Sequence, residues 1–342
     1  MAQVKAKDIA RQLNLSPAAV SLVLNDKPGV SEATRQQVFN LLKEWGCEEM
    51  MPQRSQPARH NIVLIIYRKH DKTNLSYDEH AFFSQMMEGV NTGCRKHGYN
   101  LLVTYVNGQA DPSAQLNHID QDSCDGIIVL ATEMFTTDLA IFNNTSLPLV
   151  VLDSYFERFK YDCVVINNVQ GAYEATNYLA HCGHSQIGYL KSSFDINNFA
   201  ERFEGYQKAL RINNLVFDPD QVLVVGSSIE SAYQATKALL ARKIKLPTAF
   251  FAENDLLALG AVKAFKEAGY KIPNDISVVG FDNLALTTVF EPPLTTIHVP
   301  KERLGMLAVD RLVSRINESV EEFVKIEIGT TLVERGSVKT IA

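Results

Sequence analysis

The first 46 residues constrain this chain most, because they carry the pattern of three short helices separated by tight turns. Ile9 and Leu13 fall on one face of a first helix, four residues apart. Ser16 and Pro17 begin a second helix, since a serine oxygen accepts a hydrogen bond from an early amide and proline is tolerated at the first helical position. Ser31 begins a third helix in the same way. Three short amphipathic helices predict a small all-α head with one shared core.

Such a head is typical of a helix-turn-helix, whose second helix lies in the major groove of DNA. The candidates for DNA contact lie wholly or partly on the side of the second helix that faces away from the core: Pro17, Ala18, Ser21, Leu22 and Asn25. An ordinary helical hairpin shows similar periodicity. The N-terminal position, ahead of a larger domain, favours the DNA-binding interpretation. Charge adds little, because residues 1–60 hold eight Lys and Arg against six Asp and Glu.

Composition indicates a soluble globular protein of two or three units. The 342 residues exceed one ordinary domain of about 150 residues, and 46% of them are hydrophobic. Neither an apolar signal region nor a run of about 18 apolar residues is present, so we expect a cytoplasmic protein that has no membrane contact. The cysteines are odd in number and scattered, which predicts free thiols at Cys47, Cys94, Cys124, Cys163 and Cys182.

From residue 61 onward, short apolar runs alternate with amphipathic stretches, which is typical of parallel sheets covered by helices on both faces. The runs fall in two series, and these predict two α/β lobes of like design. The first series covers residues 61–66, 101–106, 126–130 and 149–153, and the second covers 187–190, 222–225, 249–252 and 276–281.

Three strings in the head carry a family resemblance. They are VKAKDIA at 4–10, LSPAAVSLVLN at 15–25 and VSEATR at 30–35. The head thereby resembles that of the lactose-repressor (LacI/GalR) family of transcriptional regulators. With this resemblance, the candidates for DNA contact also include Lys5, Ser16, Ser31 and Arg54.

The resemblance extends over the rest of the chain and implies a clamshell like that of periplasmic sugar-binding proteins. Two doubly wound parallel-sheet lobes would enclose a ligand cleft. The resemblance implies a head at 1–46, a linker at 47–60 and an effector-binding core at 61–342. Crossings between lobes near residues 163, 294 and 323 would give lobe one at about 61–163 and 295–323, and lobe two at about 164–294 and 324–342.

Polar residues that follow buried strands are candidates for the ligand site, because the carboxyl ends of parallel strands form the binding crevice. Asp153 ends one strand, Asn254 follows another and Asp282 follows a third. Their oxygens accept hydrogen bonds from hydroxyl groups, and Arg202 adds a planar fork of donors. By the resemblance, these four residues match positions that contact the effector in the family.

Aromatic and amide side chains complete the predicted site. By the resemblance, Phe82 and Phe83 match an aromatic pair of the family, and Asn198 lies in the same loop as the arginine. Of the aromatic pair, Phe82 is the candidate to stack on a ligand ring. Structural alternatives remain open: Asp255, or Asn254 beside it, caps the following helix, and the arginine forms a surface ion pair.

Enzyme motifs are missing from the sequence. No Gly-x-Gly-x-x-Gly follows the first strand, and neither a phosphate-binding P-loop nor a nucleophile elbow occurs. His181, Cys182 and His184 lack the further ligands that a closed zinc site needs. We therefore predict that the chain is not an enzyme and uses no cofactor and no metal.

Two features depart from the family pattern. Leu22 stands where many members carry a polar or basic residue that reads a base, and leucine offers only apolar contact, for instance to a thymine methyl. Residues 47–57 contain two prolines, which interrupt a helix, and retain only Arg54 of the family's hinge pattern. Met50 or Met51 is the candidate to replace the hinge leucine as a minor-groove wedge.

The expected function is that of a transcriptional repressor that binds near-palindromic operator DNA as a homodimer. A small carbohydrate or related metabolite between the lobes would set its operator affinity by a population shift. Two alternatives stay open. One is a global regulator controlled by a protein co-repressor, and the other is a solute-binding protein, against which the N-terminal head argues.

Overall fold

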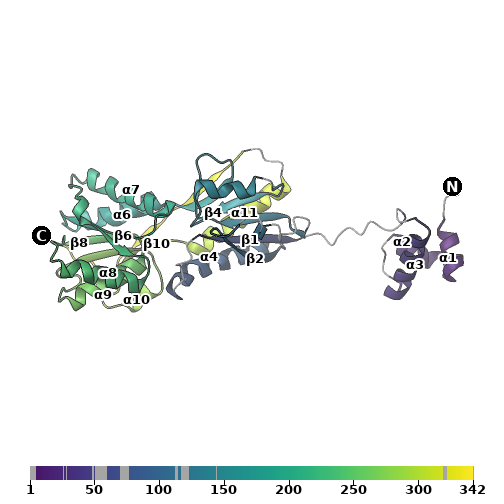
Figure 1. Cartoon of the computed structure of the whole chain (residues 1–342), viewed down its shortest axis with the longest axis horizontal. Helices are drawn as coiled ribbons and strands as arrows, with labels where there is room; N and C mark the ends of the chain where they lie inside the picture. Colours follow the sequence, from purple (N-terminus) through teal and green to yellow (C-terminus); the bar gives the residue numbers. More distant parts are fainter. Residues whose placement is uncertain are drawn as a thin grey trace. The chain divides into compact units, whose positions relative to one another are not determined.

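The chain forms two compact units, Met1–Arg59 and His60–Ala342, which we call the head and the core. Figure 1 labels many of the helices and strands of both units. The computed structural model describes residues 5–25, 27, 29–47, 50, 60–69, 77–111, 115–116, 123–143, 145–318 and 322–341. The predicted organisation, a helical head and an α/β core of two parallel-sheet lobes, is confirmed.

The described part of the head contains three α-helices: α1 (Ala6–Leu13), α2 (Pro17–Leu24) and α3 (Glu32–Glu44). Ser16 Oγ accepts a hydrogen bond from the N–H of Ala19 at 3.0 Å, so α2 begins as predicted. Ser31 Oγ accepts one from the N–H of Thr34 at 3.2 Å, which begins α3. These caps satisfy donors that a helix start leaves unpaired. The small core draws on all three helices and contains Ile9, Ala10, Val20, Val23, Val38, Leu41 and Leu42.

Lobe one of the core contains a parallel sheet in the order β11-β5-β4-β3-β1-β2. Its strands are β1 (Asn61–Arg68), β2 (Asn100–Asn107), β3 (Gly126–Leu130), β4 (Leu149–Leu152), β5 (Asp162–Ile166) and β11 (Lys325–Ile328). Every residue of β3, β4 and β5 is buried, as expected of strands covered on both faces. The edge strand β2 is mostly exposed or half-buried.

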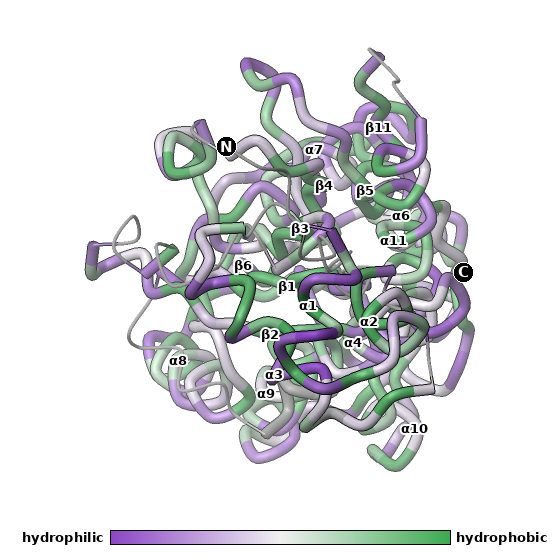
Figure 2. Tube along the Cα trace, turned by 90° about the vertical axis from the view of Figure 1, so that its right-hand side faces the viewer, coloured by the Kyte–Doolittle hydropathy of each residue, from purple (hydrophilic) through white to green (hydrophobic). Residues whose placement is uncertain are grey.

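Lobe two contains a sheet in the order β12-β10-β9-β8-β6-β7. Only β12 runs antiparallel to its described neighbour. The strands are β6 (Ile187–Ser192), β7 (Val222–Gly226), β8 (Ala249–Ala252), β9 (Ser277–Asp282), β10 (Thr295–His298) and β12 (Thr331–Val333). Figure 2 colours the Cα trace by hydropathy, with hydrophobic residues in green and hydrophilic residues in purple.

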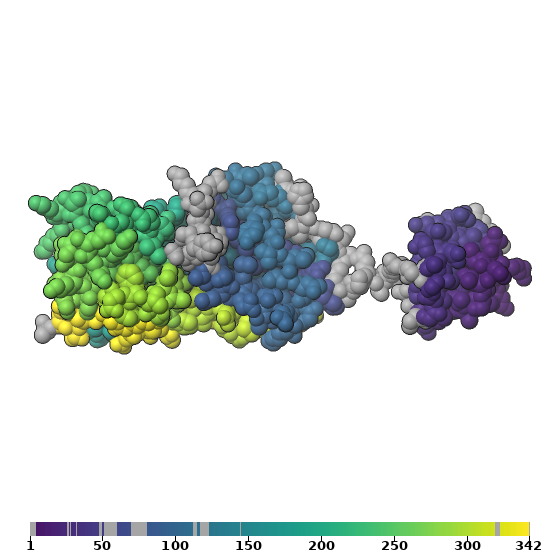
Figure 3. All heavy atoms as spheres, turned by 90° about the horizontal axis from the view of Figure 1, so that it is seen from below, coloured from purple at the N-terminus to yellow at the C-terminus, as the bar shows by residue number. Residues whose placement is uncertain are grey.

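Helices cover these sheets in packed pairs. In lobe one α4 packs against α11, and in lobe two α6 packs against α7 and α8 against α9. Figure 1 shows the strands of lobe two between the α6–α7 pair and the α8–α9 pair. Figure 3 views the core from below, where blue atoms of lobe one and green atoms of lobe two are both visible. The bounds are α4 (Tyr77–Lys96), α6 (Asn168–His181), α7 (Asn197–Ile212), α8 (Ile229–Ala241), α9 (Asp255–Glu267), α10 (Leu286–Val289) and α11 (Lys301–Asn317), with short 3-10 turns η3 (Thr136–Phe142) and η4 (Pro219–Gln221).

The chain crosses between lobes three times, each time a few residues later than predicted. Strand β5 pairs in lobe one as far as Ile166, so the first crossing follows that residue instead of lying near 163. Strand β10 pairs with β9 in lobe two as far as His298, beyond the predicted crossing near 294. Strand β11 pairs with β5 as far as Ile328, beyond the predicted crossing near 323. Each lobe boundary lies later in the sequence than predicted, because a short strand continues the sheet up to the crossing.

Candidate ligand cleft and DNA-contacting surface

A cavity of about 110 Å³, which we call the cleft, lies where the carboxyl ends of strands from both lobes converge. Its lining includes all seven side chains that the sequence predicted for effector binding: Phe82, Phe83, Asp153, Asn198, Arg202, Asn254 and Asp282. The structure thus brings together residues spread over 200 positions of the chain. Their role as ligand contacts stays a prediction.

Asp153 directly follows β4 and has a φ of +67°, in the left-handed region that favours Gly, Asn and Asp. Thr132 Oγ1 donates a hydrogen bond to its Oδ2 at 2.5 Å, and Asn198 Nδ2 donates one to its Oδ1 at 3.1 Å. Burial raises the pKa of the Asp153 carboxyl to about 6, and these donors together with the charge of Arg202 oppose the rise. Each oxygen keeps a second lone pair, so the carboxylate can still accept from a ligand.

Two consecutive asparagines at the start of α7 reach from lobe two to lobe one. Asn198 makes the bond to Asp153 given above. Asn197 Nδ2 donates to Ser154 Oγ at 3.0 Å and to the backbone oxygen of Tyr155 at 3.3 Å. These contacts join α7 to the segment that follows β4. The two lobes therefore meet through direct hydrogen bonds at the cleft.

Arg202 on α7 is only 3% exposed, so the alternative of a surface ion pair is wrong. Its Nε donates to Asn168 Oδ1 at 2.9 Å, and its Nη1 donates to the backbone oxygen of Glu253 at 2.6 Å. Its Nη2 lies 3.3 Å from Asp282 Oδ1. The guanidinium also lies 3.7 Å from the centroid of the Phe281 ring. These contacts hold the side chain in one orientation beneath the cleft.

Asp282 ends β9 with a φ of +108°, and Asn283 follows with a φ of +54°. Consecutive strained residues of this kind concentrate at functional sites. Burial raises the pKa of the Asp282 carboxyl, against the positive charges of Arg202 and Lys301. Lys301 Nζ donates to the backbone oxygen of Asp282 at 2.5 Å and to that of Val299 at 3.2 Å. This buried lysine was not predicted as part of the site, because no sequence motif marks it.

Asn254, not Asp255, caps α9, because its Oδ1 accepts from the N–H of Leu257 at 3.0 Å. Asp255 occupies the first helical position and is fully buried. The N–H of Leu284 donates to its Oδ2 at 2.8 Å, and Thr296 Oγ1 donates to its Oδ1 at 2.5 Å. The prediction that Asp255 caps the helix is wrong, since its carboxyl faces the loop after β9. Asn254 combines the cap with a place in the cleft lining.

Phe82 and Phe83 on α4 pack edge to face, with ring centroids 5.4 Å apart. Phe82 is buried, and Lys301 Nζ lies 5.6 Å from its ring centroid. Phe83 is more exposed and lines both the cleft and a neighbouring cavity. Phe83 is therefore the ring more accessible to a ligand, whereas Phe82 was the residue predicted to stack on a ligand ring.

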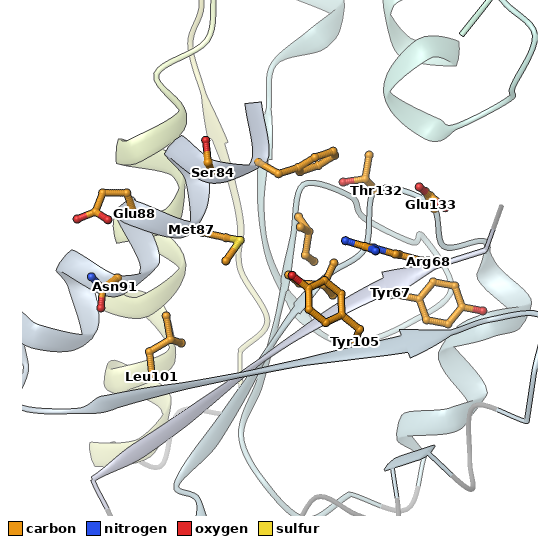
Figure 4. Close-up of a pocket in the computed structure, with 13 residues that line it drawn as sticks. Tyr67, Arg68, Ser84, Met87, Glu88, Asn91, Leu101, Tyr105, Thr132 and Glu133 are labelled. Atoms are coloured by element: carbon orange, nitrogen blue, oxygen red, sulfur yellow. The ribbon is translucent and has the colours of Figure 1, made fainter. Parts of the chain in front are cut away.

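The neighbouring cavity, of about 470 Å³, lies in lobe one beside α4, β1 and β2 (Figure 4). Phe83, Thr132 and Glu133 line this cavity and the cleft alike. The guanidinium of Arg68 lies 4.3 Å from the centroid of the Tyr105 ring. Figure 4 shows these two side chains within the cavity, opposite α4. Among the described residues that line this cavity, only Phe83 was a predicted ligand contact.

Residues 181–184 serve the fold. The ring nitrogens of His184 lie 2.9 Å from Thr248 Oγ1 and 3.2 Å from the backbone oxygen of Lys339. Among the residues that the structure describes, no three His, Cys, Asp or Glu side chains are arranged to hold a metal ion. In the same part of the chain, no helix is long and apolar enough to cross a membrane.

In the head, α2 exposes Pro17, Ala18 and Ser21. Asn25, just after α2, donates its side-chain amide to the backbone oxygen of Ser21 at 2.8 Å. Leu22 is half-buried, and its Cδ1 would lie 3.3 Å from a Cβ added at Gly29. Part of the Leu22 side chain thus covers the turn after α2. The exposed surface of α2 is formed mainly by Pro17, Ala18 and Ser21, which are small and weakly polar.

The other predicted DNA contacts are placed unevenly. Lys5 is exposed at the start of α1, and the two capping serines are exposed at the starts of their helices. Arg54 lies outside the described residues, as do Met51 and the two linker prolines. Met50 packs against the core of the head instead of projecting from it.

The chain is similar to known proteins over most of its length. Residues 5–46 match the model for bacterial regulatory proteins of the lacI family, and residues 176–338 match a periplasmic binding protein-like domain. The chain is 34% identical over 341 residues to the HTH-type transcriptional repressor PurR of Histophilus somni, covering 98% of this chain and 99% of that protein. It is 32% identical to the repressor of the same name from Aliivibrio salmonicida, covering 97% and 98%.

Solved structures give the same picture of the fold. A complex of the transcriptional regulator CelR with cellobiose has a TM-score of 0.73 at 24% identity, covering 98% of this chain and 100% of that chain. A LacI family transcriptional regulator from Enterococcus faecium with bound ribose has a TM-score of 0.69 at 26% identity, covering 82% and 100%.

Proposed function

The chain belongs to the lacI family of bacterial regulatory proteins as a DNA-binding transcriptional repressor, not an enzyme, and from this premise we propose that a small carbohydrate bound in the cleft controls its affinity for operator DNA. The head binds the operator through α2. The effector changes the fraction of molecules whose arrangement is competent for DNA. It can do so only by binding one arrangement of the two lobes more tightly than the other.

The observation that carries this proposal is the convergence of two buried aspartates from different lobes. Asp153 follows β4 of lobe one and Asp282 ends β9 of lobe two, both at positive φ. A polyhydroxylated ligand offers hydroxyl donors to both carboxylates at once, and so binds the closed arrangement more tightly. Phe83 supplies an apolar surface for one face of a sugar ring. The solved relative that holds ribose, at 26% identity, adds support.

The proposal includes a homodimer. The edge strand β2 exposes three apolar side chains, Leu102, Val103 and Tyr105, and α10 exposes Val289. Figure 1 places β2, α4, α9 and α10 along one side of the core, which Figure 3 views face on. An exposed apolar edge strand favours association with another chain. In a two-fold symmetric dimer, the same apolar surface of a second copy would pack against it. Two heads then read the half-sites of a near-palindromic operator.

We also place the protein in the cytoplasm, where a repressor meets its operator. All five cysteines are free thiols, which fits a reducing compartment. Four of the five are buried.

A ligand screen on the full chain tests the effector. Sugars, sugar phosphates and nucleobases are added to the protein at matched concentrations, and both the melting temperature and the operator affinity are measured. We expect a sugar to raise the melting temperature by mass action and to change operator affinity. Asp153→Ala should abolish both effects, whereas Glu204→Ala, at an exposed position of α7, should preserve them. If only nucleobases change the melting temperature and the operator affinity, the carbohydrate assignment is wrong. If no compound changes either quantity, control by a small-molecule effector is wrong.

A further inference from the structure

Four charged side chains meet at the floor of the cleft. They are Asp153, Asp282, Arg202 and Lys301, and each is less than a tenth exposed. Arg202 lies against Asp282, and Lys301 donates to the backbone of the same aspartate. Two anions and two cations therefore balance in a region from which water is largely excluded. A charge buried without compensation in such a place is strongly unfavourable.

Two further carboxyl groups nearby do not disturb this balance. Burial raises the pKa of Glu253 to about 8. Burial and the neighbouring charge of Asp282 raise the pKa of Asp255 to about 8 as well. Both groups therefore hold their protons at neutral pH. Asp255 accepts hydrogen bonds from the N–H of Leu284 and the hydroxyl of Thr296, and these donors oppose the rise of its pKa.

The two cations at the floor direct most of their N–H donors to groups of the protein. Arg202 directs Nε to Asn168, Nη1 to the backbone of Glu253 and Nη2 toward Asp282. Lys301 directs its ammonium to two backbone oxygens. Among the described residues that line the cleft, Arg202 is the only cation.

Acceptors, by contrast, face the cleft. The carboxylates of Asp153 and Asp282 both line it, and Glu133 adds a third carboxyl at the boundary with the neighbouring cavity. Lysine and arginine side chains that could offset a further negative charge are absent from the described lining apart from Arg202. A phosphate or carboxylate entering this space would meet three acidic side chains and a single cation, Arg202, whose charge Asp282 already offsets.

We propose that the effector is an uncharged molecule that presents hydroxyl or N–H donors to Asp153 and Asp282, and that the cleft rejects phosphorylated and acidic forms of the same sugar. This inference rests on the proposed function, because it specifies the ligand of the same cleft. The inference predicts that free sugars bind and that sugar phosphates do not. A polar cleft that contains an arginine, considered without its acidic side chains, would be expected to bind both.

Matched pairs of ligands test the inference. Isothermal titration of the full chain compares D-ribose with ribose 5-phosphate and D-glucose with glucose 6-phosphate at constant ionic strength. For any sugar that binds, we expect its phosphate ester to bind at least about 100-fold more weakly, because like charges placed together oppose association. Asp282→Asn removes one anion from the floor and should reduce this discrimination at least about 10-fold.

Controls keep the two proposals distinguishable. If Asp282→Asn does not fold, Glu133→Gln at the boundary of the cleft removes a negative charge and should narrow the same ratio. Glu204→Gln, exposed on α7, should leave the ratio unchanged. A phosphate ester that binds more tightly than its sugar would overturn the charge rule while leaving effector control intact. Failure of every sugar and every ester to bind or to alter operator affinity would overturn the proposed function and the inference with it.

Discussion

The side-chain amide of Asn198 on α7 donates to Asp153 Oδ1 across the boundary between the two lobes, at 3.1 Å. Asp153 lies in lobe one and Asn198 in lobe two, and both are buried. The aspartate can therefore sense both the ligand and the position of the opposite lobe. This places lobe closure and ligand recognition on the same carboxylate.

Asn198→Ala should weaken effector binding. The change removes one donor from a buried carboxylate and one link between the lobes, which corresponds to a loss of about 10-fold in affinity. Isothermal titration with the effector identified by the screen measures it. Gln207→Ala, on the exposed side of the same helix, serves as the control and should keep the original affinity. Unchanged affinity in Asn198→Ala would show that the inter-lobe bond does not contribute.

The stability of the core should fall as pH rises from about 4 to about 8. Burial raises the pKa of Asp153 to about 6 and that of Glu253 to about 8, above the value of about 4 of an unfolded carboxyl. The folded state therefore keeps protons that the unfolded state releases, so the stabilisation is complete below pH 4 and is lost as pH passes through these values.

Glu253→Gln tests this pH dependence, because glutamine keeps the shape of the side chain without titrating. The melting temperature of the variant should decline less between pH 6 and pH 8 than that of the original chain. Calorimetry at constant ionic strength provides the measurement. Glu204→Gln at an exposed site should reproduce the original slope, and an equal slope in both variants would remove Glu253 as the cause.

Two serines of the head should separate stability from DNA binding. Ser16→Ala removes the cap of α2 and should lower the free energy of unfolding of the head by about 1 kcal/mol. Ser21→Ala, at an exposed position of α2, should change stability by less than about 0.5 kcal/mol yet weaken operator binding. Fluorescence of Trp45, the single tryptophan of the chain, follows head unfolding, and anisotropy of labelled operator DNA follows binding. Full operator affinity in Ser21→Ala would argue against contact through this face.

Val103→Asp should produce monomers and reduce operator affinity. The substitution places a carboxylate in the apolar patch of β2, where like charges from two copies would face one another. Light scattering coupled to size-exclusion chromatography reports the mass. Val216→Asp changes an equally apolar residue, 85% exposed after α7, and should leave the mass of the original chain unaltered. If both variants keep the same dimer mass, the interface lies elsewhere.

Local signals made the head predictable. Serine caps and apolar residues at helical spacing act within a few positions, and the structure confirms the starts of α2 and α3. Apolar runs predicted eight of the twelve described strands equally well. Four strands were missed: β5, β10, β11 and β12. None of the four is longer than five residues, and β11 alternates exposed and half-buried positions. Pairing with distant strands, and not local composition, determines such elements.

Within the cleft, the strand-end rule found Asp153 and Asp282 because polar residues after buried strands are visible in the sequence. Lys301 was not predictable in this way. Its place depends on a bond to a backbone oxygen 19 positions earlier, formed when α11 enters lobe one. Thr132 similarly acts on Asp153 from another strand end. Side chains that support a site in this way cannot be predicted from the sequence, because their contacts form only when the chain folds.

The left-handed backbone at Asp153 and Asp282 has a consequence for how this protein can diverge. Glycine, asparagine and aspartate occupy such positions readily, whereas other residues, above all β-branched ones, incur about 1–2 kcal/mol of strain. Related proteins that bind a different effector can therefore carry asparagine or glycine at either of these two positions. A larger or β-branched residue would fit only if the backbone conformation there changed as well. The backbone conformation at the ends of these two strands thus limits which side chains, and hence which effectors, the cleft can acquire by substitution.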